Sequence, residues 1–109
     1  MRSAAIALVS AAFIAGCGGG SSASQSDNDK AVAAAQSAFK RAEAGGQDLS
    51  DGPCIAEQLP GLSDWAVDIA HDPRQAVDDQ PANQCQSYRN GQTHHFVELT
   101  PEGQLIRAR

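Results

Sequence analysis

The chain has 109 residues, enough for one small domain and too few for two. Its thirteen acidic and eight basic side chains give a formal net charge of −5. Because nucleic-acid phosphates require clustered Lys and Arg, this balance excludes nucleic acid as the expected partner.

The first sixteen residues have the order of a secretory signal. Arg2 is followed by an uncharged run of apolar and small residues from 3 to 16. That run is shorter than the about 20 apolar residues of a membrane-spanning helix. A basic start, an apolar middle and small residues at the end are typical of a cleaved signal peptide. We therefore predict that residues 1–16 are removed on export.

The end of this segment, Ile14-Ala15-Gly16-Cys17, resembles the lipobox of bacterial lipoproteins. The resemblance covers residues 1–17 and implies that Cys17 carries a diacylglyceryl group and becomes the new N-terminus. Several acyl chains, at about 0.8 kcal/mol per buried CH₂, hold a protein stably on a bilayer. The membrane is then a partner through the lipid anchor. The implied location is the extracytoplasmic face of the cell membrane, or the outer membrane if the host has two.

Gly and Ser dominate the residues that follow Cys17, so we expect residues 17–26 to form the lipidated cysteine and a flexible tether. The folded domain is expected to span residues 27–109. It should begin with one amphipathic helix, capped by Ser26 or Asp27 and ended by a Gly-Gly pair at 45–46. Apolar residues recur at helical spacing at Val32, Ala35, Phe39 and Ala42.

The middle of the chain predicts a short helix, a strand and a loop. A Gly-Pro pair at 52–53 and a Pro-Gly pair at 60–61 bracket the short turn of helix. From 65 to 71 apolar residues occupy alternate positions, which is typical of a half-buried strand. The polar segment 72–82, with its two prolines, is expected to be a loop and a contact surface.

The last part of the chain predicts three more strands. Residues 84–99 contain Asn90-Gly91, the strongest short signal for a hairpin turn. A turn with proline at its second position then leads to a final strand over 104–109. The expected fold is α+β, with one N-terminal helix packed on a four-stranded antiparallel meander sheet in two layers.

Cys54 and Cys85 are expected to form one disulfide, joining the short helix to the second strand. A domain of this length buries only about 60% of its unfolded surface, and exported proteins accept disulfides. Closing the loop between the two cysteines contributes about 3–4 kcal/mol in the chain-entropy model. Two free thiols are the alternative.

The sequence contains no recognisable catalytic set. His71 and Asp72 are adjacent on an expected strand, so their side chains should point to opposite faces. Neither a G-x-S-x-G turn nor a phosphate-binding glycine loop is present in the sequence. We therefore expect no enzymatic activity, no catalytic residues and no cofactor.

Two sets of residues are candidates for binding. A divalent-metal site would use His71, Asp72, Asp78, Asp79 and His95, with His94 as an alternative to His95. The other reading of this set is a solvated acidic loop and two strand histidines.

The second set is a basic binding surface formed by Arg74, Arg89 and Arg107. Arginines can bind a carboxylate or a phosphate. Alternatively, Arg89, Arg107 and Arg109 balance Asp68 and Glu98 across strands.

Together these features predict a lipid-anchored, non-catalytic binding module of the cell envelope, with an envelope protein as candidate partner. Two alternatives remain open. The protein could be an inhibitor of an envelope protease or lysozyme that inserts loop 72–82 into a cleft of its target, or a metal-binding lipoprotein that uses the His/Asp set.

Overall fold

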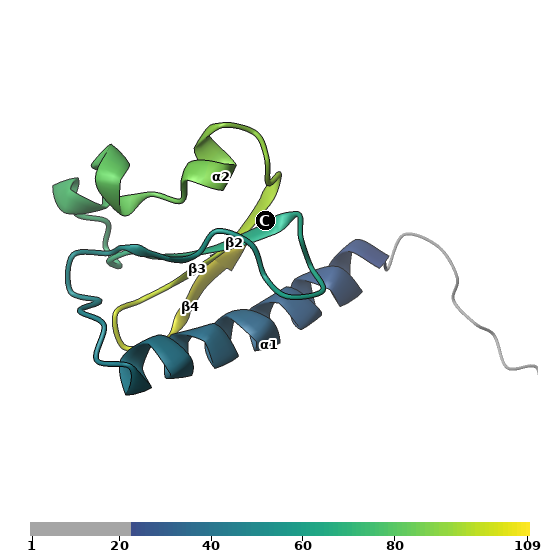
Figure 1. The fold of residues 1–109 in the computed structure, drawn as a ribbon, viewed down its shortest axis with the longest axis horizontal. Helices are drawn as coiled ribbons and strands as arrows, with labels where there is room; N and C mark the ends of the chain where they lie inside the picture. The colour runs from purple at the N-terminus through teal and green to yellow at the C-terminus, as the bar shows by residue number, and fades with distance from the viewer. Residues whose placement is uncertain (1–22) are drawn as a thin grey trace, which may run out of the picture.

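The computed structural model of the chain describes residues 23–109, with side chains from Ser26 onward. The predicted signal peptide, the lipidation site Cys17 and most of the predicted tether lie outside the described residues. The described part is an α+β domain with one main helix and a four-stranded sheet, a class that the sequence predicts correctly (Figure 1). Within it, no helix combines the length and the apolar character needed to cross a bilayer.

The main helix, α1, spans Ala23–Ala44. It begins four residues before the predicted start at Asp27, because neither Gly nor Pro interrupts the chain after Gly20. Its end lies where the sequence places it, since Gly46 adopts a φ of 75° that favours glycine.

Four strands form one sheet, with the order β1-β2-β3-β4. They are β1 (Cys54–Ala56), β2 (Trp65–Ile69), β3 (His95–Leu99) and β4 (Leu105–Ala108). The outer pairs β1–β2 and β3–β4 are antiparallel, but the central pair β2–β3 is parallel. The sheet is therefore mixed, and the predicted antiparallel meander is wrong.

The parallel pair requires a crossover between the end of β2 and the start of β3. This crossover, residues 70–94, contains η1 (Ala76–Asp79), η2 (Pro81–Asn83) and α2 (Gln86–Arg89). The predicted hairpin about Asn90-Gly91 is therefore wrong. Gly91, with a φ of 80°, follows α2 and adopts the left-handed backbone conformation that commonly ends a helix. An Asn-Gly pair can therefore end a helix as well as form a hairpin turn.

The short helix predicted around Cys54 is also wrong, because these residues form the edge strand β1. β1 pairs with β2, and the backbone N–H of Ile69 continues the pairing by donating to the carbonyl of Pro53. The predicted disulfide is confirmed: Cys54 and Cys85 are bonded, with their Cα atoms 4.9 Å apart. It joins β1 to the residue before α2, and so ties the crossover to the edge of the sheet.

The main core lies between α1 and one face of the sheet. Small residues of the helix let it approach closely, and they meet branched residues from the two central strands. The principal members are Ala31, Ala35, Phe39, Val67, Ile69, Val97 and Leu99. Figure 1 shows the crossover helices on the other side of the sheet from α1. Because it is covered on both faces, β2 is almost fully buried and not half-buried as predicted, with Ala66 as inaccessible as Val67.

Candidate ligand-binding pocket

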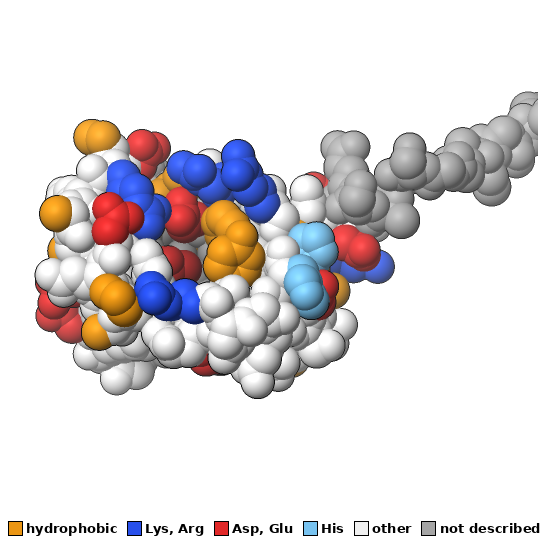
Figure 2. All heavy atoms as spheres, turned by 90° about the horizontal axis from the view of Figure 1, so that it is seen from above, with side chains coloured by type: hydrophobic (Ala, Val, Ile, Leu, Met, Phe, Trp, Pro, Cys, Tyr) orange, Lys and Arg blue, Asp and Glu red, His pale blue; other side chains and the backbone are white. Residues whose placement is uncertain are grey.

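A cavity of about 280 Å³ lies between the crossover and the sheet face opposite α1. Its charged lining residues are Asp68, Arg74, Arg89, Glu98, Arg107 and Arg109. Figure 2 looks onto this face and shows acidic side chains in a hollow flanked by basic ones. Two acidic and four basic side chains therefore surround one cavity of an otherwise acidic protein.

Strand register sets the arrangement of the charged residues on the sheet. Asp68 on β2 is paired with Glu98 on β3, and Glu98 is paired with Arg107 on β4. Since successive side chains of a strand alternate between faces, these three point away from the core that Val67 and Val97 help to form. The result is a row of charges across three neighbouring strands.

Two arginines hold the carboxylate of Glu98, whose side chain is only 9% exposed. Arg74 reaches Oε2 from the crossover, with Nη1 at 3.2 Å, and Arg107 reaches Oε1 from β4, with Nε at 3.2 Å. Arg74 is itself positioned by Asp79, whose Oδ1 lies 2.8 Å from its Nε. Glu98 is therefore a buried, doubly paired anion at the floor of the pocket.

The carboxyl group of Asp68 has a different environment. Burial raises its pKa and the negative charge of Glu98 raises it further, to about 7, although Arg74 acts in the opposite direction. Its Oδ1 is buried and has no hydrogen-bond partner among the described residues. Asp68 is therefore the one carboxyl group of the pocket that gains from being neutral.

Two aromatic rings add an apolar wall to the pocket. Tyr88 on α2 and Phe96 on β3 lie edge to face, with ring centroids 4.9 Å apart. Tyr88 is 46% exposed, because it lies on a surface helix and not in the strand that the sequence predicts. Trp65, by contrast, is buried.

Several guanidinium groups of the pocket keep donors for a ligand. Arg89 gives one hydrogen bond, from Nη1 to Oε1 of Gln84 at 2.7 Å. Arg107 forms an ion pair with Glu98 through Nε, and within residues 26–109 its two terminal nitrogens form no hydrogen bond, nor does the side chain of Arg109. The predicted basic surface of Arg74, Arg89 and Arg107 thus lines a single cavity.

The predicted metal ligands do not form one site, because the structure brings His71 and Asp78 together but places His95 far from both. His95 starts β3, opposite Trp65 in the parallel register, whereas His71 lies beyond the end of β2. Six residues along a strand, at about 3.3 Å each, separate the two positions by about 20 Å.

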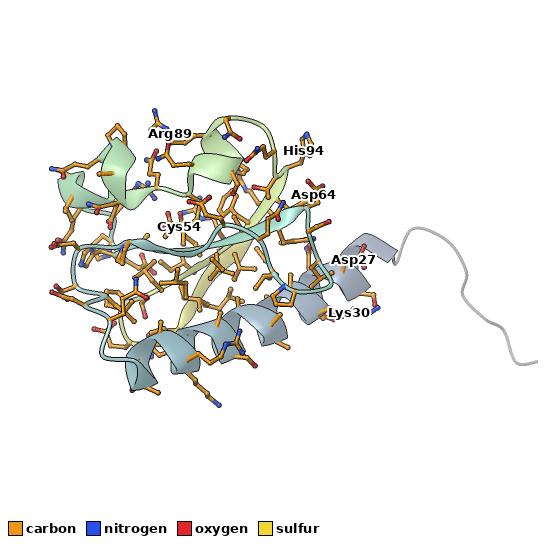
Figure 3. All side chains as sticks on the ribbon, in the orientation of Figure 1. Asp27, Lys30, Cys54, Asp64, Arg89 and His94 are labelled. Carbon is orange, nitrogen blue, oxygen red and sulfur yellow. A yellow bond between two sulfur atoms is a disulfide. The ribbon has the colours of Figure 1, made fainter. Side chains whose placement is uncertain are left out.

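Each member of that set has a partner or position of its own. Asp78 accepts a hydrogen bond from His71, Asp79 pairs with Arg74, and Asp72 is exposed. His95 stacks on Trp65 and lies near Asp64, which also bonds the neighbouring His94 (Figure 3). Among the described residues, the only group of three metal-ligand side chains with close ligand atoms is Cys54, Glu57 and Cys85, and its two sulfurs are bonded to each other.

Asp68, Glu98 and Arg109 were not predicted as site residues. The sequence indicated only that Asp68 and Glu98 could balance arginines across strands. The signal that could have found them is a carboxylate in the middle of an apolar strand, in "WAVDI" and again in "HFVEL". No protein-family model matches the chain, and the comparisons with curated proteins and with solved structures give no match.

Proposed function

We propose that the protein is a lipid-anchored, non-catalytic binding module of the cell envelope, and that it binds a small organic anion in the pocket between the crossover and the sheet. The anchor follows from the resemblance of residues 14–17 to a lipobox. The binding function rests on one observation: four of the eight Lys and Arg residues of an acidic chain line one cavity.

The pocket supports an anionic ligand on electrostatic grounds. Glu98 neutralises part of the charge of Arg74 and Arg107, while Arg89 and Arg109 add positive charge without a carboxylate partner among the described side chains. Positive charge within a partly enclosed cavity concentrates anions. Guanidinium groups bind carboxylate and phosphate oxygens through paired N–H donors.

The cavity also limits the size and shape of the ligand. Its volume of about 280 Å³ lies just below the about 300–1,000 Å³ typical of small-molecule sites, so the ligand must be small. The exposed ring of Tyr88 and the edge of Phe96 offer an apolar surface next to the arginines. A small acid with a flat apolar part fits this combination.

The binding proposal is tested by calorimetric titration of the detergent-purified, full-length protein with benzoate and with phenyl phosphate. We expect both anions to bind, and we expect benzylamine, a cation of similar shape, not to bind. Arg107→Gln should weaken benzoate binding at least tenfold. Arg41→Gln, on the exposed surface of α1, is the matched control and should leave binding unchanged. Equal affinities for both variants would refute the assignment of the site.

The proposed anchor has a separate test. Cys17→Ser should move the protein from the membrane fraction to the soluble fraction, because the acyl chains that hold it can no longer be attached. Retention of this variant in the membrane fraction would contradict the lipobox reading without affecting the pocket.

A further inference from the structure

Asp68 and Glu98 lie directly opposite each other on two parallel strands, and both side chains face the pocket. Two carboxylates this close in a partly buried site do not both ionise freely, since each raises the cost of charging the other. Glu98 has Arg74 and Arg107 on its two oxygens, whereas Asp68 forms no such ion pair among the described residues. The proton of the pair therefore belongs to Asp68.

The buried Oδ1 of Asp68 supports the same assignment. In the ionised form, this unpartnered oxygen would carry half of a negative charge in a place that water does not reach. In the neutral acid it becomes an ordinary carbonyl oxygen, which costs less to leave without a partner. The other oxygen then carries the O–H group, on a residue that lines the cavity.

We propose that the pocket takes up its anion together with one proton, and that Asp68 carries this proton and donates it in a hydrogen bond to an oxygen of the bound anion. This inference rests on the proposed anion-binding function. Above neutral pH, ionised Asp68 takes up one proton from solvent when the anion binds. No other covalent bond forms or breaks. The ligand is then the anion of a weak acid, held by arginine donors on one side and by the carboxyl O–H on the other.

The charged groups around Asp68 favour this coupling. β3 presents Glu98 and the crossover presents Asp78, and both oppose ionisation, while Arg74 favours it. Arg107 on β4 and Arg89 on α2 line the same cavity and attract the anion. β1 places Cys54 opposite Asp68, but this cysteine is in the disulfide and does not titrate. A bound anion adds one more negative charge and so strengthens the preference for neutral Asp68.

The sign of the pH effect follows from this arrangement. At pH 5.5 Asp68 already holds its proton, so an anion should bind with almost no proton uptake. At pH 8 it is mostly ionised, so binding should take up close to one proton. Above the pKa of the free protein, the affinity should fall by up to about tenfold for each pH unit.

The test is titration of the full-length protein with benzoate at pH 5.5 and at pH 8, each in two buffers with different heats of ionisation. The dependence of the observed heat on the buffer measures the number of protons taken up. We expect close to one proton at pH 8 and close to none at pH 5.5. Asp68→Asn should abolish the uptake, whereas Asp29→Asn, on the exposed surface of α1, should preserve it.

A second measurement needs no variant. Carbon NMR of the Asp68 carboxyl group, with and without benzoate, should show its titration moving to higher pH in the complex. Benzoate binding without proton uptake, or with proton release, overturns this inference alone. Failure of both benzoate and phenyl phosphate to bind at either pH overturns the proposed function and this inference with it.

Discussion

The carboxylate of Asp78 accepts a hydrogen bond from Nδ1 of His71 at 2.9 Å, and these two residues anchor the start of the crossover. Asp78 also accepts the backbone N–H groups of His71 and Gln75, and its side chain is only 1% exposed. One buried carboxylate thus fixes the bend that brings Arg74 over Glu98. The pocket depends on this local network as much as on the sheet.

Asp78→Ala should lower the free energy of unfolding by about 2–4 kcal/mol, because it leaves buried donors without a partner. Burial tends to raise the pKa of Asp78, but the hydrogen bonds from Gln75 and His71 outweigh it and hold the pKa below its usual value of 3.8. The stabilisation is therefore present above about pH 4 and lost as the pH falls through that lowered pKa. Urea denaturation at pH 7 measures the loss.

Asp79→Ala is the matched control for that experiment. Asp79 has an exposed side chain, and its one ion pair among the described residues is with Arg74 at the surface. Its removal should cost no more than about 1 kcal/mol. Equal losses for the two variants would show that the buried network does not stabilise the crossover.

Asp68 should make the free energy of unfolding depend on pH in the opposite direction to Asp78. Its pKa rises from 3.8 in the unfolded chain to about 7 in the folded domain. A raised pKa stabilises the fold fully below the unfolded value, and that stabilisation is lost as the pH rises through the folded value. The difference corresponds to at most about 4 kcal/mol. Urea denaturation at pH 4.5, 6 and 8 should therefore show wild type losing stability relative to Asp68→Asn, and parallel curves would contradict this.

Gly52 and Gly91 both have positive φ, of 71° and 80°, but different surroundings. A Cβ at Gly52 would lie 2.8 Å from the carbonyl oxygen of Ile69 and would also overlap the carboxylate of Asp78. A Cβ at Gly91 would meet no atom within 4 Å. We expect Gly91→Ala to cost about 1–2 kcal/mol through backbone conformation alone.

Gly52→Ala should cost more than Gly91→Ala, by a further about 1–3 kcal/mol, because the added methyl group overpacks a buried site. Thermal denaturation of the two variants measures the difference directly. Similar melting temperatures for the two variants would contradict this prediction and would mean that the backbone around residue 52 shifts to accommodate the added methyl group.

Replacing both cysteines, Cys54→Ser with Cys85→Ser, should lower the free energy of unfolding by about 3–4 kcal/mol, from the loop that the disulfide closes. Wild type unfolded with a reducing agent present should match the double variant, since both lack the bond between β1 and the crossover. A loss below about 1 kcal/mol in both experiments would show that the crossover is held mainly by other contacts.

Several local features could be predicted because they depend on neighbouring residues. The alternation of Trp65, Val67 and Ile69 marked β2, and Gly46 marked the end of the helix. The pairing of Cys54 with Cys85 followed from the number of cysteines once Cys17 was assigned to the lipid. Each of these inferences uses backbone geometry, periodicity or counting within the chain.

The errors arose where a local signal has two readings. Asn90-Gly91 can close a hairpin or follow a helix, and here it follows α2. A residue distant in sequence favours the helix: the carboxylate of Glu57 accepts hydrogen bonds from the backbone N–H groups of Gln86 and Ser87, the first two residues of α2. A contact of this kind, across about thirty residues of sequence, has no periodicity to reveal it.

By itself, the sequence determined the α+β class, the disulfide and the acidic character of the domain, because composition and local pattern carry that information. Only the tertiary structure decided that β2 and β3 are parallel, and with it the site. Parallel pairing places Asp68 beside Glu98. It also requires the intervening chain to cross over the sheet face opposite α1, and this crossover places Arg74 in contact with Glu98. These residues lie up to thirty positions apart in sequence, and only the register of the strands makes them neighbours.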